Sequence, residues 1–266
     1  MTAPRPDPST VGQWWVLTVR AIAPTWRNGE LLISVVLSGI FTVSYYVPLK
    51  KMIGDVVPEV GNYAQYLMPL ITLQAIYFSG MSGGLRSAID SMEGINRRFG
   101  AMPIRPLTPL AARMSANLYR SSAALITAIV FGHIIGFRFH RGLGCTVAFC
   151  VLALLIGLMV TFVGDLAGAV SKSPEATSYL LLMPSLILIM LSVGIQPVEL
   201  FPEWIQPFVR DQPFSRFVYA LRALAGDAAD VAGSPIWRVV GPALAWLVGI
   251  MLIAVPLYAH VLRRPR

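Results

Sequence analysis

The sequence predicts an all-α integral membrane protein with six transmembrane helices. Six stretches without Asp, Glu, Lys or Arg run through residues 31–49, 61–85, 121–137, 142–164, 176–198 and 239–261. A bilayer core of ~30 Å needs roughly 20 helical residues, and a helix satisfies its own backbone polar groups in lipid. The composition agrees, because 56% of the residues are hydrophobic and 13% are charged, against about 25% charged in soluble domains.

Composition and motifs exclude several classes of function. The net charge is +8, but no long basic run lies outside the flanks of the apolar stretches, which argues against nucleic-acid binding. The sequence contains no Gly-x-x-x-x-Gly-Lys-Ser/Thr loop, no His-Glu-x-x-His and no Cys/His cluster. We therefore expect no catalytic residues, no metal site and no nucleotide site in this chain.

The positions of the arginines predict the orientation in the membrane. Arg20 and Arg27 precede the first apolar stretch, Arg97 and Arg98 lie between the second and third, and Arg263 follows the last. Short loops rich in Arg stay in the cytoplasm, which places both termini on the cytoplasmic side of the cell membrane. Two arginines between the third and fourth stretches, at positions 138 and 141, point the other way.

Residues 11–27 form a candidate amphipathic helix ahead of the first span. Gln13, Arg20 and Arg27 recur every seven residues on one face, and Trp14 and Trp15 lie on the apolar side. Such a helix lies along the lipid headgroups. The alternative is an amphipathic helix that only connects the N-terminus to the first span and has no mechanical role.

The connection between the second and third spans contains a second candidate helix. Asp90, Glu93, Arg97 and Arg98 share one surface of it, and Phe99 lies on the other. A short amphipathic helix with an exposed aromatic ring suits docking to a soluble partner. The alternative is a solvated loop whose charges only fix the topology.

The connection before the last span is too aromatic for a free loop. It carries Phe201, Trp204, Phe208 and Phe214 among several prolines. Two short helices that dip into the outer leaflet would bury these rings, because irregular backbone at membrane depth needs cover from protein or a cavity. The segment is then an external cap, and the alternative is a surface cap without a role in transport.

Two charges and a cluster of small residues lie within the spans. Arg120 and Asp165 fall toward the cytoplasmic half at similar depth, and a buried Arg requires a partner. We hypothesise an ion pair between them. The alternative is that Arg120 alone extends to the headgroups. Gly80, Gly83 and Gly84 predict close helix packing, which we expect to be within the chain rather than between subunits.

Several motifs resemble a known family. They are GINRRF at 94–99, MP at 102–103, PLTPL at 106–110, GFRFHRG at 136–142, FP at 201–202, QP at 212–213 and ALRALAGD at 220–227. Together they resemble the membrane subunits of ABC-2 exporters, in particular the daunorubicin-resistance (Drr) permeases of actinobacteria and mycobacteria. The resemblance spans nearly the whole chain.

The resemblance implies a type V exporter fold in a single transmembrane domain over 1–266. It implies a connecting helix at 11–27, a six-helix ABC-2 domain at 30–262, a coupling helix at 90–102 and an external re-entrant segment at 198–225. In such a subunit the coupling helix faces the ATPase, here through Glu93, Asn96, Arg97, Arg98 and Phe99.

The resemblance also implies partners and cargo. The chain itself needs no cofactor, since ATP and Mg²⁺ belong to a separate DrrA-like ATPase subunit, and a DrrC-like second permease completes a heterodimer. The exported molecule is an anthracycline-like drug or a hydrophobic lipid similar to phthiocerol dimycocerosate. A non-transporting scaffold or assembly factor for envelope lipid synthesis is the alternative. An intramembrane acyl- or glycosyltransferase is disfavoured, because the spans lack a polar catalytic cluster.

Overall fold

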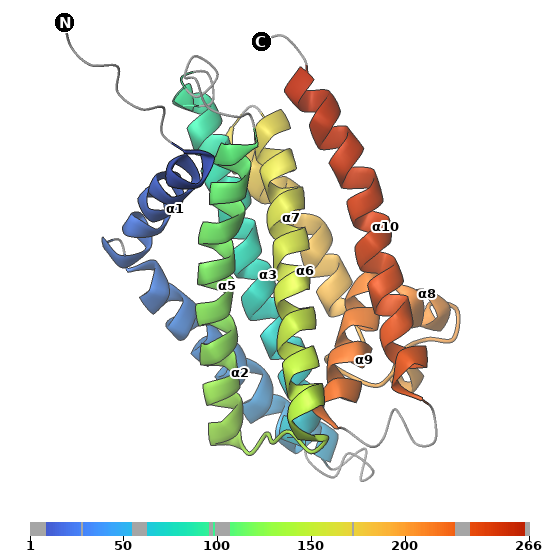
Figure 1. Cartoon of the computed structure of the whole chain (residues 1–266). Coiled ribbons are helices and arrows are strands. Elements are labelled where there is room, and N and C mark those ends of the chain that lie inside the picture. Colours follow the sequence, from blue (N-terminus) through green and yellow to red (C-terminus); the bar gives the residue numbers. More distant parts are fainter. Residues whose placement is uncertain are drawn as a thin grey trace, which may run out of the picture.

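The structure is a computed structural model that describes residues 9–27, 29–54, 63–95, 98, 107–171, 173–226 and 235–263. All regular secondary structure in these residues is helical (Figure 1). The helices are α1 (Thr10–Arg27), α2 (Glu30–Gly54), α3 (Tyr63–Met92), α5 (Thr108–Ile135), α6 (Gly142–Val170), α7 (Pro174–Met190), the 3-10 turn η1 (Val198–Leu200), α8 (Gln206–Asp211), α9 (Pro213–Ala225) and α10 (Ile236–Arg263).

Each predicted apolar stretch overlaps one described helix. Of the described helices, α5, α6 and α10 are long and apolar enough to cross a membrane by length and composition, and α7 is a shorter apolar helix. The predicted fifth stretch is too long at its end, because α7 stops at Met190 and the chain then turns before Pro197. The all-helical class is confirmed.

Helix α3 is the centre of the bundle. It contacts α2, α5, α6, α7 and α9, and Figure 1 shows it behind α5 and α6. Its residues from Tyr63 to Ile76 are all buried, including the polar Gln65 and Gln74. Gln74 donates a hydrogen bond to the Tyr45 hydroxyl at 3.0 Å, which satisfies part of its amide inside the bundle.

The closest helix contact lies between α3 and α6. A Cβ atom added to Gly84 would lie 2.6–2.7 Å from the backbone of Gly164, and one added to Gly168 would lie 2.4 Å from the Gly84 carbonyl oxygen. Only glycine allows two backbones to approach this closely, which is how small residues stabilise helix pairs in lipid. The prediction that this glycine cluster packs within the chain is confirmed for Gly80 and Gly84.

Helix α1 lies against α5 at the end of the bundle where α10 ends (Figure 1). Trp14 Nε1 donates to Ser115 Oγ at 3.2 Å, and the side chains of Thr18 and Thr25 are buried. The opposite face of α1 is apolar and exposed, with Trp15 and Trp26 at 59% and 67% exposure. The predicted helix at 11–27 is therefore present, and its apolar face points away from the protein.

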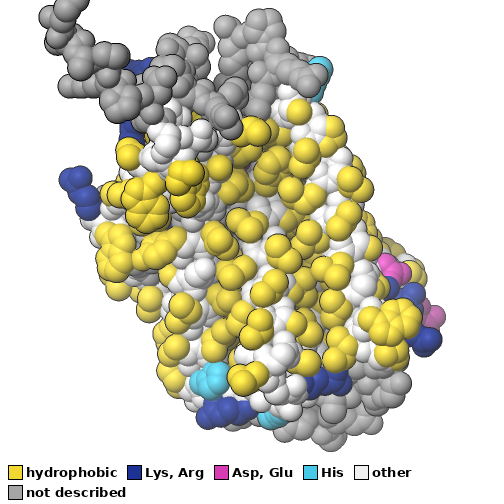
Figure 2. Space-filling model, viewed as in Figure 1, with side chains coloured by type: hydrophobic (Ala, Val, Ile, Leu, Met, Phe, Trp, Pro, Cys, Tyr) yellow, Lys and Arg dark blue, Asp and Glu magenta, His cyan; other side chains and the backbone are white. Residues whose placement is uncertain are grey.

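Hydrophobic side chains cover the face of the bundle shown in Figure 2, and the charged side chains of that face gather toward its two ends. Exposed apolar residues of this kind occur along α5, α6 and α10, for example Ile126, Val151 and Leu252. A soluble protein rarely exposes so large a continuous apolar surface. This surface is suited to lipid.

The segment before α10 folds back onto the bundle. Helix α9 contacts α3, α6 and α10. Helix α8 precedes it and lies beside α10, in the half of the bundle away from α1 (Figure 1). Nearly all of α9 from Phe214 to Ala225 is buried. The predicted re-entrant segment at 198–225 is thus built from η1, α8 and α9.

Candidate functional site

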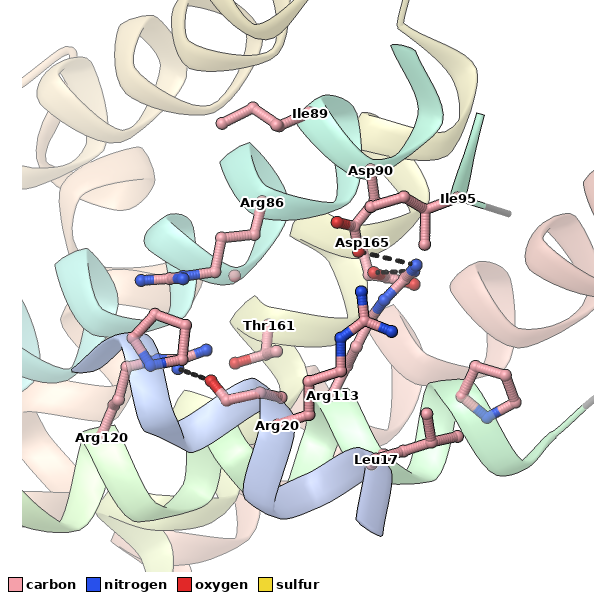
Figure 3. Close-up of a pocket in the computed structure, with 15 residues that line it drawn as sticks. Leu17, Arg20, Arg86, Ile89, Asp90, Ile95, Arg113, Arg120, Thr161 and Asp165 are labelled. Carbon is pink, nitrogen blue, oxygen red and sulfur yellow. Dashed lines mark hydrogen bonds and ion pairs between the residues drawn. The ribbon is translucent and has the colours of Figure 1, made fainter. Parts of the chain in front are cut away.

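A cavity of about 300 Å³ lies between α1, α3, α5 and α6. Figure 3 shows the polar side chains that project into it from these helices. The charged residues that line it are Arg20, Arg86, Asp90, Arg113, Arg120 and Asp165. The cavity therefore combines four guanidinium groups with two carboxylates.

Arg113 is the centre of an ionic network beside this cavity. Its Nη1 lies 3.1 Å from Asp165 Oδ1, and its Nη2 lies 3.1 Å from Asp90 Oδ2. The Tyr258 hydroxyl donates to the other Asp165 oxygen at 2.6 Å. Because Asp90 belongs to the last turn of α3 and Asp165 to α6, Arg113 joins α5 to both of these helices, and Tyr258 joins α10 to the network through Asp165.

The hypothesis of a direct Arg120–Asp165 ion pair is wrong. Arg120 Nη1 donates to the Ala21 carbonyl oxygen at 3.3 Å and to Thr25 Oγ1 at 3.1 Å, and Asp165 pairs with Arg113 instead. Asp165 lies one helical turn beyond Thr161 on α6, opposite Arg113. No partner was expected for Arg113 from the sequence.

The alternative for Arg120, extension to the headgroups, does not apply either. Arg120 is 6% exposed, and its Nε donates to Asn117 Oδ1 at 3.3 Å. Among the described residues no carboxylate forms an ion pair with it. Arg120 therefore holds α1 against α5 through neutral oxygen acceptors. In the sequence, Thr18 and Thr25 are seven residues apart and therefore share one face of α1. This spacing was the available signal that α1 presents a buried polar face to α5.

The predicted coupling residues lie just beyond α3. The helix continues through Asp90 to Met92, so the predicted start of a separate helix at position 90 is wrong. Gly94, with φ +69°, then redirects the chain, because this conformation is unfavourable for residues with a Cβ. Glu93 and Arg98 are exposed. Asn96, Arg97 and Phe99 lie outside the described residues.

The four predicted cap aromatics fall into two groups. Phe214 is buried, and its ring centroid lies 5.9 Å from that of Tyr77. Phe201 packs against the core. Trp204 is 81% exposed and Phe208 is 49% exposed. The expectation that all these rings are buried against the spans is therefore wrong for the last two, which point outward.

Polar contacts anchor the cap to α10. The carboxylate of Asp211 pairs with Arg216 and, at 3.5 Å, with Arg210, while Trp246 Nε1 of α10 donates to the Asp211 carbonyl oxygen at 3.0 Å. Burial is the largest single effect and raises the pKa of the Asp211 carboxyl, but the hydrogen bonds and charges of Arg216 and Arg210 together outweigh it and hold the pKa below its usual value. Asp211 thus keeps its charge at neutral pH, and these pairs are lost only as the pH falls through that lowered pKa.

Arg222 of α9 was not predicted as a site residue. It is 1% exposed, its guanidinium lies 3.7 Å from the centroid of the Tyr66 ring, and it donates to the Tyr66 and Val193 carbonyl oxygens at 3.2 Å each. The available signal was that Arg222 interrupts an otherwise uncharged, mostly apolar run from Phe217 to Ala225. These contacts fix α9 to α3 and to the chain that follows α7.

The sequence profile described as ABC-2 type transporter matches residues 12–225. The chain belongs to the ABC-2 type transporter family. The match runs from α1 to the end of α9 and so includes Asp90, Arg113 and Asp165 but not Tyr258.

Individual ABC-2 relatives are similar over most of their length. The chain is 44% identical over 263 residues to the doxorubicin resistance ABC transporter permease protein DrrB of Mycobacterium tuberculosis, covering 97% of this chain and 91% of the relative. It is 28% identical to the probable doxorubicin resistance permease DrrC of the same species, covering 91% and 86%. A daunorubicin resistance ABC transporter permease of Streptomyces coeruleorubidus is 27% identical, covering 79% and 72%.

Proposed function

We propose that this chain is the membrane subunit of an ATP-driven exporter that moves a hydrophobic drug of the anthracycline class out of the cell. Support comes from membership of the ABC-2 family and from relatives named for doxorubicin and daunorubicin resistance. In this proposal α2, α3, α5, α6, α7 and α10 cross the membrane, and both termini lie in the cytoplasm.

The observation that carries the mechanism is the ionic network around Arg113. The segment that would receive the ATPase begins directly after α3, whose last turn contains Asp90. Movement of that segment is passed through Asp90 and Arg113 to Asp165 on α6 and to Tyr258 on α10. A buried ion pair suits this role, because it is strong only in the geometry that fits it.

Helix α1 moves with the same network. Arg120 fixes α1 to α5 through Ala21 and Thr25, so a shift of α5 carries α1 along. The far end of the bundle is closed by α8 and α9, which we assign to the outer exit. Trp204 and Phe208 there present exposed rings to departing cargo.

The partners follow from the same proposal. The sequence has no phosphate-binding loop, so a separate DrrA-like subunit holds ATP and Mg²⁺ and supplies the hydrolysis. The chain resembles DrrB over more of its length and with higher identity than DrrC. We therefore propose that it occupies the DrrB position in a heterodimer with a DrrC-like permease.

Co-purification tests the partnership. The chain alone should show no ATPase activity, and vanadate-sensitive hydrolysis should appear only with the ATPase subunit present. Robust hydrolysis by this polypeptide alone would refute the proposal. Failure to copurify with any ATPase would instead favour the scaffold alternative.

Asp165→Asn tests the mechanism in the assembled complex. The amide keeps the shape but removes the charge that holds Arg113, so drug export per ATP hydrolysed should fall about tenfold while the complex still assembles. Glu175→Gln is the matched control, because Glu175 is an exposed carboxylate at the start of α7. Equal effects of the two variants would exclude a role for the network in coupling.

The cargo is tested in a strain that lacks the chain. Increased sensitivity to daunorubicin and increased retention of the drug should accompany the deletion, and both should be reversed by the intact gene. Loss of an exported envelope lipid with unchanged drug sensitivity would assign the lipid as cargo instead.

A further inference from the structure

We propose that the cavity beneath α1 binds the phosphate of an anionic membrane lipid. This inference concerns a ligand site and does not depend on what the protein exports. It begins with the charge of the cavity wall, where four arginines face two aspartates. The lining residues thus carry two more positive than negative charges.

Both carboxylates contact Arg113, so two negative charges are shared among the four arginines. Asp90 and Asp165 each contact Arg113 at 3.1 Å. Arg120, by contrast, is buried among the neutral oxygens of Ala21, Thr25 and Asn117. A surplus of cations in a low-dielectric setting is costly unless an anion accompanies it. The site therefore favours an anion and disfavours a cationic ligand.

The residue type indicates which anion. Arginine presents a planar fork of N–H donors that matches the oxygens of phosphate, and it is more weakly hydrated than lysine. Arg20, Arg86 and Arg120 line the cavity from three different helices. Figure 3 shows Arg86 and Arg120 on one side of Thr161 and Arg20 on the other side, beside Arg113. The volume of about 300 Å³ is at the lower end of the roughly 300–1,000 Å³ of small-molecule pockets. A phosphate with part of its glycerol group suits such a site.

The surroundings indicate that the phosphate comes from a lipid. A second hollow, of about 380 Å³, shares Arg20 and Pro24 with the cavity and extends to the exposed Arg27. The exposed face of α1 beside it carries Trp15, Val16 and Trp26. A helix with an apolar face of this kind lies at the level of the headgroups, where cationic side chains meet anionic lipids. Arg27 and Arg20 then lead a headgroup inward to Arg86 and Arg120.

Binding to the purified full-length chain tests this site. The probes are dioctanoyl phosphatidylglycerol, dioctanoylglycerol, which has the same acyl chains without phosphate, and soluble glycerol phosphate. Binding is followed by native mass spectrometry and by the thermal midpoint in neutral detergent. We expect saturable binding and stabilisation by phosphatidylglycerol, and neither effect from dioctanoylglycerol.

Variants locate the binding. Arg20→Gln and Arg86→Gln should each weaken the binding of phosphatidylglycerol about tenfold, since each removes one charge-assisted contact. Arg20→Lys, which keeps the charge but not the planar fork, should weaken it less than Arg20→Gln. Arg138→Gln is the control, because Arg138 lies beyond the far end of α5. Arg20 is exposed, so its substitution leaves the packing of the bundle intact.

Three results would overturn the proposal. Equal binding of dioctanoylglycerol would show that acyl chains alone determine the affinity. Equally tight binding of glycerol phosphate would assign the site to a soluble anion rather than a lipid. Unchanged affinity in both Arg20→Gln and Arg86→Gln would place the lipid elsewhere on the protein.

Discussion

Replacing Gly84 by alanine is expected to force α3 and α6 apart. The added Cβ would lie 2.6 Å from the Gly164 carbonyl oxygen and 2.7 Å from its carbonyl carbon and Cα. Carbon atoms in contact prefer ~3.5–4.0 Å, so the two helices must separate by roughly 1 Å. The clash is with backbone rather than with a flexible side chain, and no rotamer change relieves it.

The magnitude follows from two opposing effects. Overpacking of a tight core costs about 1–3 kcal/mol, and the rigid neighbour favours the upper part of that range. The better helix propensity of alanine offsets up to about 1 kcal/mol. A net loss of about 1–2 kcal/mol lowers the thermal midpoint by about 2–8 °C, at roughly 2–4 °C per kcal/mol for a protein of this size.

The assay is thermal unfolding of the purified chain in detergent, followed by tryptophan fluorescence. Gly249→Ala is the matched control, because Gly249 lies inside α10 and a Cβ there meets nothing within 4 Å. Its midpoint should stay the same or rise slightly. A Gly84→Ala midpoint equal to that of the unmodified chain, or an equal fall in Gly249→Ala, would refute the close contact of α3 with α6.

Three further predictions concern the two ends of the bundle. Replacing Arg97 and Arg98 together by Glu should uncouple hydrolysis from export or dissociate the complex, while the protein still inserts into the membrane. If export and assembly both survive, the charges of this segment only fix the topology. Trp204→Ala should lower export more than protein level, whereas Phe214→Ala, which empties a buried site, should lower the protein level itself; the reverse order would contradict the cap assignment. A cysteine at Glu203, in a background without native cysteines, should react with an impermeant thiol reagent from outside the cell, and labelling only from inside would reverse the topology.

The helices were predictable because lipid imposes a simple rule on sequence. An apolar stretch of the right length forms a helix wherever it lies, so all six stretches coincide with helices. The helix at 11–27 and the short helices between 198 and 225 were also predictable, from the spacing of Arg20 and Arg27 and from the aromatic residues near Trp204. The end of α7 was not, because the chain from 191 to 196 is uncharged like the rest of that stretch and yet turns.

The pairing of charges could not be predicted from spacing alone. Arg113 and Asp165 are 52 residues apart. Arg113 and Arg120 are seven residues apart and share one face of α5, so which of them meets Asp165 depends on how α5 is shifted along its axis relative to α6. Arg120 was the arginine inside the apolar stretch and therefore the apparent partner. Arg113 lies two turns earlier on α5, where it reaches both Asp90 and Asp165.

ATP-driven transport is the most direct test of the proposed exporter. Inside-out membrane vesicles that contain this chain, the ATPase subunit and the second permease should accumulate doxorubicin when ATP is added, and not with a non-hydrolysable analogue. Vesicles that lack only this chain should not accumulate it. Equal ATP-driven accumulation without the chain would contradict the account.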